Sequence, residues 1–170
     1  EVQLRAGVGF VNPVGDGSAD GNAVAAEIAA GVDVFEQKPG ERLPWYRHII
    51  AGLRARFAKV PEILESPAGT IEHDVGTQVA DVGVAWQPHL TSGGALRLDV
   101  GTGVGVGHVD GRELPDGMSV NGEISVTNPW DLGVTLTGEN VGVRVGGNCT
   151  VAGERPLQTC GGSVQAQVRF

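Results

Sequence analysis

The last eight residues of the chain alternate strictly between polar and apolar side chains. One parity holds Val164, Ala166, Val168 and Phe170, and the other holds Ser163, Gln165, Gln167 and Arg169. A period of two is that of a β-strand with one apolar and one polar face. A chain built from such strands must find an apolar environment for one whole face of each.

The same alternation recurs in seven earlier segments. They span residues 2–10, 24–34, 48–57, 79–86, 96–107, 118–126 and 132–145, and residues 163–170 form the eighth. Twenty-eight glycines among 170 residues suit short strands joined by turns and argue against a helical bundle. We predict one all-β domain over residues 1–170, an eight-stranded antiparallel up-and-down β-barrel.

The connections differ in length in a regular way. Those after the first, third, fifth and seventh segments are longer, and include an acidic connection at 59–75, whereas residues 91–94 and 128–131 are expected to form tight turns. Outer-membrane barrels have long external loops and short periplasmic turns. No apolar run reaches the roughly 18 residues of a membrane helix, but a barrel strand crosses with about ten alternating residues.

The aromatic side chains are expected at strand ends. Six fall at the end that this topology makes periplasmic and two at the opposite end: Phe35, Trp45, Tyr46, Trp86, Trp130 and Phe170, then Phe10 and Phe57. Rings at both ends are typical of the aromatic girdles of membrane barrels, whereas a soluble sandwich places large rings in its core.

The polar parity carries equal numbers of acidic and basic residues, and every basic one is arginine. These residues are Arg5, Glu27, Asp33, Arg54, Arg56, Asp81, Arg97, Asp99, Glu123 and Arg144. An enclosed lumen needs near-neutral pairing, and the arginine fork binds carboxylates bidentately. We therefore predict an internal ion-pair network. Glycines on this parity would relieve crowding beside Arg54 and Arg56, or leave a narrow water path.

The whole chain resembles the small bacterial outer-membrane β-barrels of the OmpA transmembrane domain, OmpX and opacity-protein type. The resemblance rests on alternation, aromatic ends, loop asymmetry and the terminal Phe170. It implies a transmembrane barrel with periplasmic termini, exported behind a removed signal peptide. It also implies contact with outer-membrane lipid and lipopolysaccharide, and assembly machinery that reads the C-terminal strand.

The seventh segment changes parity within itself. Leu132, Val134 and Leu136 share one parity, but Val141 and Val143 share the other. A β-bulge at residues 138–140 would reconcile them, and a hairpin turn there would give nine strands or a different fold. We favour the bulge because it leaves an even strand count, as bacterial barrels require.

The two cysteines, Cys149 and Cys160, have no histidine or further cysteine at metal-ligand spacing. A disulfide between them would indicate an oxidising compartment, and two free thiols are the alternative. We predict no metal site and no cofactor.

The four long connections carry ten acidic and three basic residues, nearly the whole net charge of −8. The acidic ones are Asp16, Asp20, Glu62, Glu65, Glu72, Asp74, Asp110, Glu113, Asp116 and Glu154, and the basic ones are Lys59, Arg112 and Arg155. Such a rim could attract a cationic or protein partner, and the net charge disfavours nucleic acid.

Some barrels of this size are enzymes that act on lipid A, and their pattern needs a serine two residues from a histidine. None of His48, His73, His89 and His108 is followed by such a serine. We expect a non-enzymatic outer-membrane barrel with a largely plugged lumen that acts through its loops. The alternatives are a narrow pore for water, ions or small solutes, and a secreted soluble β-barrel binding protein.

Overall fold

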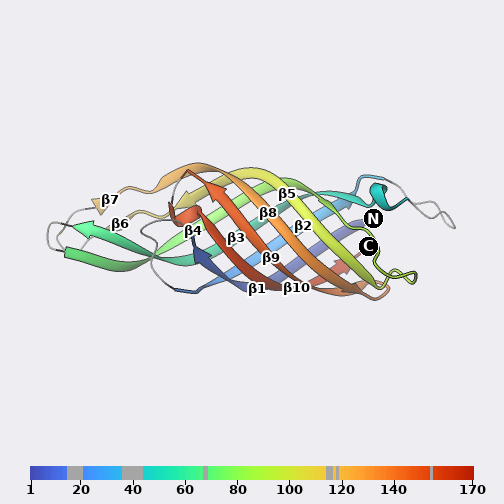
Figure 1. The fold of residues 1–170 in the computed structure, drawn as a ribbon. Coiled ribbons are helices and arrows are strands. Elements are labelled where there is room, and N and C mark those ends of the chain that lie inside the picture. The colour runs from blue at the N-terminus through green and yellow to red at the C-terminus, as the bar shows by residue number, and fades with distance from the viewer. Residues whose placement is uncertain (15–20, 36–43, 67–68, 114–116, 118, 154) are drawn as a thin grey trace.

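The protein is an antiparallel barrel of eight strands. The computed structural model describes residues 1–14, 21–35, 44–66, 69–113, 117, 119–153 and 155–170. The barrel strands are β1 (Val2–Pro13), β2 (Ala23–Asp33), β3 (Ile49–Ser66), β4 (Gly69–Trp86), β5 (Leu96–Val109), β8 (Glu123–Thr137), β9 (Val141–Ala152) and β10 (Thr159–Arg169). Each pairs with the next along the chain, and β1 pairs with β10, which closes the cylinder (Figure 1). The predicted fold class is confirmed.

Short elements lie between the barrel strands. β6 (Arg112–Glu113) and β7 (Ser119–Val120) form a small separate sheet between β5 and β8, and η1 (Trp45–Arg47) and η2 (Arg155–Leu157) are single 3-10 turns. Among the described residues no helix is long and apolar enough to cross a membrane.

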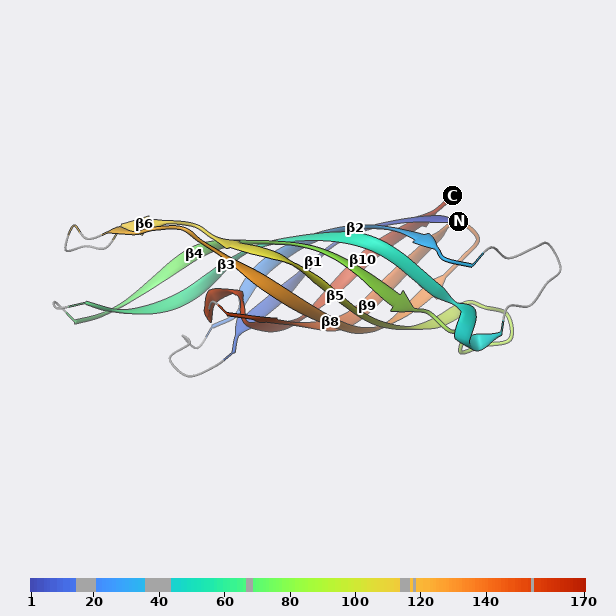
Figure 2. The same ribbon diagram turned by 90° about the horizontal axis from the view of Figure 1, so that it is seen from above.

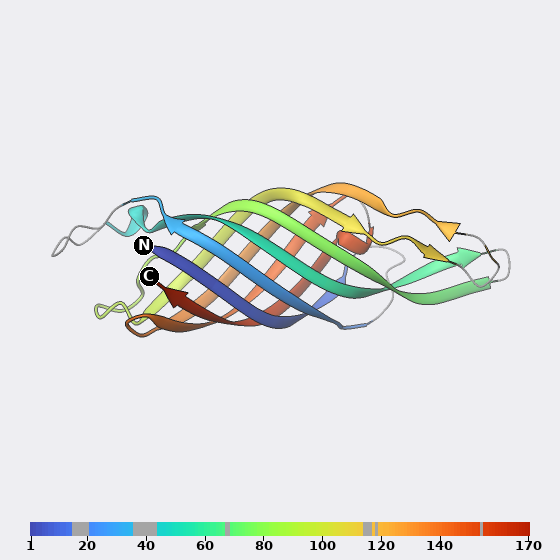
Figure 3. The ribbon, with the colours of Figure 1, turned by 180° about the vertical axis from the view of Figure 1, so that it is seen from behind.

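The two ends of the barrel differ in shape. Both termini lie at one end, which we call the terminal end, and two ribbons project from the other, the loop end (Figures 2 and 3). One is the β3–β4 ribbon, residues 59–76: β3 pairs with β2 only as far as Ala58 and β4 with β5 only from Thr77, while β3 and β4 remain paired out to Ser66 and Gly69. The other is the β6–β7 hairpin.

The expectation of a loop at 59–75 is therefore wrong. Its acidic residues and prolines disfavour a strand in the middle of a sheet, but among the described strands residues 59–66 of β3 pair with β4 alone, so this part of β3 is a sheet edge. Pro61 lies on such an edge, where a missing N–H costs no ladder bond. The links at the terminal end are also not uniformly short, because residues 34–48 separate β2 from β3.

The predicted turn at 128–131 is also wrong, because these residues lie in the middle of β8. Pro129 stands opposite Gly103 of β5, at a gap in the ladder between the pairs Thr102–Trp130 and Gly105–Thr127. Proline has no N–H to donate there. The Asn128 side chain replaces it, since its Nδ2 donates to the Gly103 carbonyl at 2.6 Å.

Residues 138–140 form a hairpin turn between β8 and β9, so the favoured bulge is wrong. The Gly138 N–H donates to the Val141 carbonyl at 2.7 Å. A turn of three residues changes the parity of the outward positions, which explains why Leu136 and Val141 both face outward. The eight strands remain because the two errors offset: one expected strand boundary disappears at 128–131 and one appears here.

The wall has an apolar outside and a polar inside. Within the closed part of the barrel, no outward position of the described strands carries Asp, Glu, Lys or Arg. Val24, Ile124 and Val126 are 77%, 76% and 69% exposed, whereas Arg144 and Asp99 are fully buried. This is the reverse of a water-soluble protein and is the arrangement of a wall that faces lipid.

We expect Asn128→Ala to destabilise the barrel by about 1–3 kcal/mol, because the Gly103 carbonyl loses its donor in an apolar wall. Urea unfolding of the protein folded into lipid vesicles measures the loss. The double variant Asn128→Ala with Pro129→Val restores an N–H opposite Gly103 and should recover most of the stability. Equal unfolding midpoints for Asn128→Ala and the parent would contradict this account of the gap.

Candidate functional site

Alternating charges cross the lumen as a chain of ion pairs. Arg54 Nε lies 3.0 Å from Asp81 Oδ2, and Arg54 Nη1 lies 4.0 Å from Asp131 Oδ1. Arg144 Nη2 lies 2.6 Å from Asp131 Oδ2, and Arg144 Nε lies 3.7 Å from Asp99 Oδ2. These five residues, the central ion-pair chain, come from β4, β3, β8, β9 and β5. They tie opposite walls together.

The most buried part of this chain is the best supported by neighbours. Asp99 also accepts hydrogen bonds from Gln87 Nε2 and Thr135 Oγ1. A side chain at Gly133 or Gly146 would come within 2.5 or 2.8 Å of the Arg144 guanidinium. Gly133 and Gly146 thus leave room for Arg144, while Gly52, Gly83 and Gly101 line a small cavity together with Arg54. A buried charge pair needs such additional hydrogen bonds to offset its desolvation.

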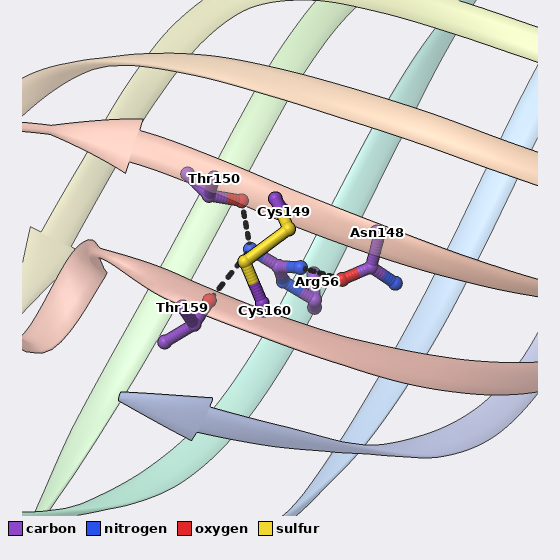
Figure 4. The surroundings of a disulfide bond; sticks show 6 residues. All are labelled: Arg56, Asn148, Cys149, Thr150, Thr159 and Cys160. Atoms are coloured by element: carbon purple, nitrogen blue, oxygen red, sulfur yellow. Dashed lines mark hydrogen bonds between the residues drawn. A yellow bond between two sulfur atoms is a disulfide. The ribbon is translucent and has the colours of Figure 1, made fainter. Parts of the chain in front are cut away.

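Arg56 is bound by neutral groups instead of a carboxylate. It crosses the lumen from β3 to β9 and β10, where Nη1 donates to Asn148 Oδ1 at 2.6 Å (Figure 4). Its Nη2 donates to Thr150 Oγ1 and, at 3.4 Å, to Thr159 Oγ1.

Arg5 and Glu27 line a small lumen cavity of about 70 Å³ together with Arg54, Asp81 and Asp131. Glu27 Oε1 accepts a hydrogen bond from Gln165 Nε2 at 2.8 Å. The cavity has room for a few water molecules and is far smaller than a ligand pocket.

The other expected members lie away from the central chain. Asp33 is 3.9 Å from the N-terminal ammonium at the terminal end. Arg97 Nε is buried without a hydrogen-bond partner among the described residues. Glu123 is exposed at the loop-end start of β8.

Sequence reasoning missed several lumen residues. Asp131 was assigned to a turn, and the buried Gln3, Gln87, Gln165, Gln167, Thr135 and Arg169 were not singled out. Treating 123–137 as one strand would have placed Asp131 on the inward parity, with Thr127 and Thr135.

The inside of the barrel becomes apolar near the loop end. Val75, Val79, Val109 and Leu157 form one buried cluster, and Val11, Val60, Ala23 and Ala25 form another. Leu157 belongs to η2, in the link between β9 and β10, and is 1% exposed. A side chain at Gly107 would meet Leu157 within 2.6 Å. These two apolar clusters fill the lumen between the central ion-pair chain and the loop end.

The predicted disulfide is present. Cys149 of β9 and Cys160 of β10 stand opposite each other in the ladder with Cα atoms 4.0 Å apart. The bond joins β9 and β10 at the base of the link that carries Leu157. Figure 4 shows the bond together with Arg56 and the residues that bind it. It therefore restrains the segment that packs into the loop-end mouth.

Most aromatic residues lie near the ends of the closed barrel, and Trp130 is the exception. Trp45 and Trp86 pack at the terminal end with ring centroids 5.4 Å apart, and Trp86 Nε1 donates to the Trp45 carbonyl at 2.7 Å. Trp130 was expected at the terminal end as well. It lies on the outward side of mid-β8, opposite Cys149, because the turn assigned beside it does not exist.

The terminal-end mouth holds two histidines. The rings of His48 and His89 lie 4.7 Å apart, and a β-bridge sets His89 beside Arg97. Burial, and then the positive charge of Arg97, lower the pKa of His89 from 6.5 to about 4. His89 is therefore neutral at physiological pH.

The ribbons at the loop end are joined by a buried ion pair. Arg112 Nη2 of β6 lies 2.6 Å from Glu62 Oε1 of β3. Glu72 and Asp74 of β4 line a groove of about 460 Å³ with Lys59, Pro61 and Asn22. No group of three potential metal-ligating residues occurs among the described residues. Asp16, Asp20, Asp116, Glu154 and the side chain of Glu65 lie outside them.

Comparison with known proteins finds relatives by structure only. No protein-family model and no curated protein matches the sequence. Neisserial surface protein A is similar in structure, with a TM-score of 0.69 and 14% identity over 99% of this chain and 97% of that one. Ail, the attachment invasion locus protein of Yersinia pestis, gives 0.58 and 12% over 98% and 95%. The N-terminal β-barrel domain of Pseudomonas aeruginosa OprF gives 0.56 and 11% over 99% and 96%.

The chain has the fold of the small eight-stranded outer-membrane barrels. The agreement spans nearly the full length of each protein, although identity is low. Such an outer-membrane barrel fold tolerates this divergence because it constrains the sidedness of each position more than its identity.

We expect Arg144→Met to destabilise the barrel by about 3–5 kcal/mol, because it leaves the buried Asp99 without a cation and Asp131 with only Arg54, 4.0 Å away. Arg56→Met is the matched control, since it leaves only neutral partners and should cost less. Adding Asp99→Asn to Arg144→Met should recover part of the loss. Equal unfolding midpoints in urea for the two single variants would contradict a structural role for the central ion-pair chain.

We expect His89 to titrate with a midpoint near pH 4 in NMR spectra of its imidazole. Because the folded pKa lies below the unfolded one, the unfolded chain binds the proton first as the pH falls from 6.5, and acidification then favours unfolding. Arg97→Gln should raise the midpoint, whereas Lys59→Gln at the opposite end should leave it unchanged. A midpoint near 6.5 in the parent would rule out the buried environment.

Proposed function

We propose that the protein is an integral outer-membrane barrel with periplasmic termini and a filled lumen, acting without catalysis through its loop end. The absence of Asp, Glu, Lys and Arg from the outward positions of the described strands, within the closed part of the barrel, carries this proposal. A soluble barrel would expose more than thirty large apolar side chains of this kind to water at a prohibitive cost, roughly 25 cal/mol per Å².

The terminal strand fits the same proposal. β10 presents alternating outward Val164, Ala166 and Val168, and its last outward residue, Phe170, is exposed beyond the strand. This pattern supports recognition by barrel-assembly machinery. Outer-membrane phospholipid and lipopolysaccharide are the proposed surroundings of the wall.

The ribbons are the proposed functional surface. Glu72 and Asp74 face outward beyond the barrel, beside Lys59, on a ribbon anchored by the Arg112–Glu62 pair. Their negative charge supports binding of a cationic or protein partner, with an affinity that falls as salt rises. The names of two structural relatives, a surface protein and an attachment invasion locus protein, agree with a role at the cell surface.

A narrow pore is the second candidate, and the lumen cavity favours it. That cavity is only about 70 Å³, however, and it lies between the central ion-pair chain and a terminal end lined by buried glutamines. At the loop end the lumen is packed with apolar side chains, Leu157 among them. These features support a plug.

Refolded protein in lipid vesicles should migrate faster on a gel before boiling than after it, because detergent does not unfold a closed membrane barrel at room temperature. In planar bilayers the same protein should produce no discrete conductance, and Leu157→Ala should stay silent because the ion pairs still fill the lumen.

Two results would contradict the proposal in different ways. Protein that stays monodisperse without detergent would favour the soluble barrel. Steady single-channel conductance by the parent would favour the pore.

A further inference from the structure

One side of the terminal end carries a cluster of aromatic rings around a single cation. Trp45 and Tyr46 belong to η1, in the link between β2 and β3, and their ring centroids lie 6.0 Å apart. Trp86 ends β4 and packs on Trp45. We call Phe35, Trp45, Tyr46, Arg47 and Trp86 the rim cluster. Figures 1 and 3 show η1 at the terminal end, beside the first half of the barrel.

Arg47 packs on a ring and has no carboxylate partner among the described residues. Its guanidinium carbon lies 5.8 Å above the Phe35 ring, and its backbone N–H donates to the Pro44 carbonyl at 2.9 Å. Its side chain is exposed, and no carboxylate of the described residues lies within ion-pair distance of it. A positive charge stacked on a ring at the edge of a lipid-facing wall can bind an anion there.

The wall next to the rim cluster is hollowed. An apolar groove of about 840 Å³ lies over the outward side of the wall and is lined by residues from β10, from β1 to β4 and from β5, with Leu4, Ala30, Leu53 and Ala55 among them. It contains almost no exposed polar surface. β3 passes from the rim at Ile49 to the groove at Ala55, six residues or roughly 20 Å along a strand. That distance is comparable to half the thickness of a bilayer.

On the side of the terminal end formed by β5, β8 and β9, the described residues form no aromatic cluster. Its outward residues next to the links of β5, β8 and β9 are aliphatic, namely Leu96, Leu136 and Val141. Aromatic side chains at a membrane interface anchor a barrel on all sides when they form a complete ring. A cluster on one side, with its own cation and an adjoining groove, instead has the shape of a site for one molecule.

We propose that the rim cluster and the groove bind one anionic glycerophospholipid of the periplasmic leaflet. The phosphate lies against the Arg47 guanidinium at the edge of the rim cluster, and an acyl chain fills the groove beside Leu53 and Ala55. The positive charge of Arg47 selects a headgroup with net negative charge over a zwitterionic one. This inference rests on the proposed membrane location.

The three tryptophans allow a direct test. Trp130→Phe leaves reporters only in the rim cluster, and Trp45→Phe with Trp86→Phe leaves only Trp130, on mid-β8. Each variant is folded into bilayers that mix an anionic and a zwitterionic phospholipid, with bromine on the acyl chains of one or the other. Quenching of tryptophan fluorescence then gives the local composition at each reporter.

We expect the anionic lipid to be enriched about fivefold at the rim cluster and not at Trp130, a factor set by one cation near the surface. Arg47→Gln should bring the rim value to that of the bulk bilayer. Ala55→Phe fills the groove without changing charge and should lower the enrichment as well.

Equal enrichment at both reporters, or enrichment that survives Arg47→Gln, would overturn the site while leaving the membrane barrel intact. Absence of quenching by either brominated lipid at either reporter would overturn the membrane location itself, and the site with it. Gel mobility of each variant before and after boiling confirms that it has folded.

Discussion

The barrel depends on the pairing of charges inside a wall that is one residue thick. Every side chain of a strand points either to the lumen or to the surroundings, so an ionised group has only the lumen available when the outside is lipid. Arg144 is fully buried and satisfies this constraint only because Asp131 lies on the neighbouring strand β8 and Asp99 on the strand after it, β5. The register of β8 and β9 is therefore coupled to electrostatics, since a slip of one residue would turn Arg144 toward lipid.

The same constraint explains the small residues of the lumen. An eight-stranded barrel is just wide enough for its own side chains, so a long arginine side chain needs small residues beside it. Gly133 and Gly146 provide this space beside Arg144. Toward the loop end, where the ion pairs stop, the volume is filled by Val75, Val109 and Leu157. Charged and apolar layers thus divide the interior along the barrel axis.

Alternation predicted the sidedness of most charges, whereas the count of eight strands also used the expectation of an even number and held because two errors offset. It failed where a local signal opposed it. Asn128 and Pro129 have the composition of a turn, but the Asn128 amide supplies the hydrogen bond that Pro129 cannot, and the strand continues. The hairpin at 138–140 was missed because a bulge also changes parity and preserved an even count.

The sequence predicted that ion pairs fill the lumen, but it did not predict which arginine pairs with which carboxylate. Which arginine meets which carboxylate depends on the stagger between strands distant in sequence, as Arg54 and Asp131 show. Arg56 was expected to pair with a carboxylate and binds Asn148 and two threonines, because those groups lie opposite it across the lumen. Periodicity carries no information on how far one strand is offset from another. The sequence could therefore name the inward residues but not their partners across the lumen.

A barrel with a packed interior can act only through its wall and its two ends, and here the ends have opposite chemistry. The terminal end carries an exposed arginine among aromatic rings, and the loop end carries outward carboxylates on ribbons that extend beyond the closed barrel. The edge strands of such ribbons invite strand addition by another chain. Negative charge along them disfavours pairing with a second copy of the same ribbon while leaving a basic segment free to approach. Under the proposed function, the same carboxylates disfavour self-association and select the partner.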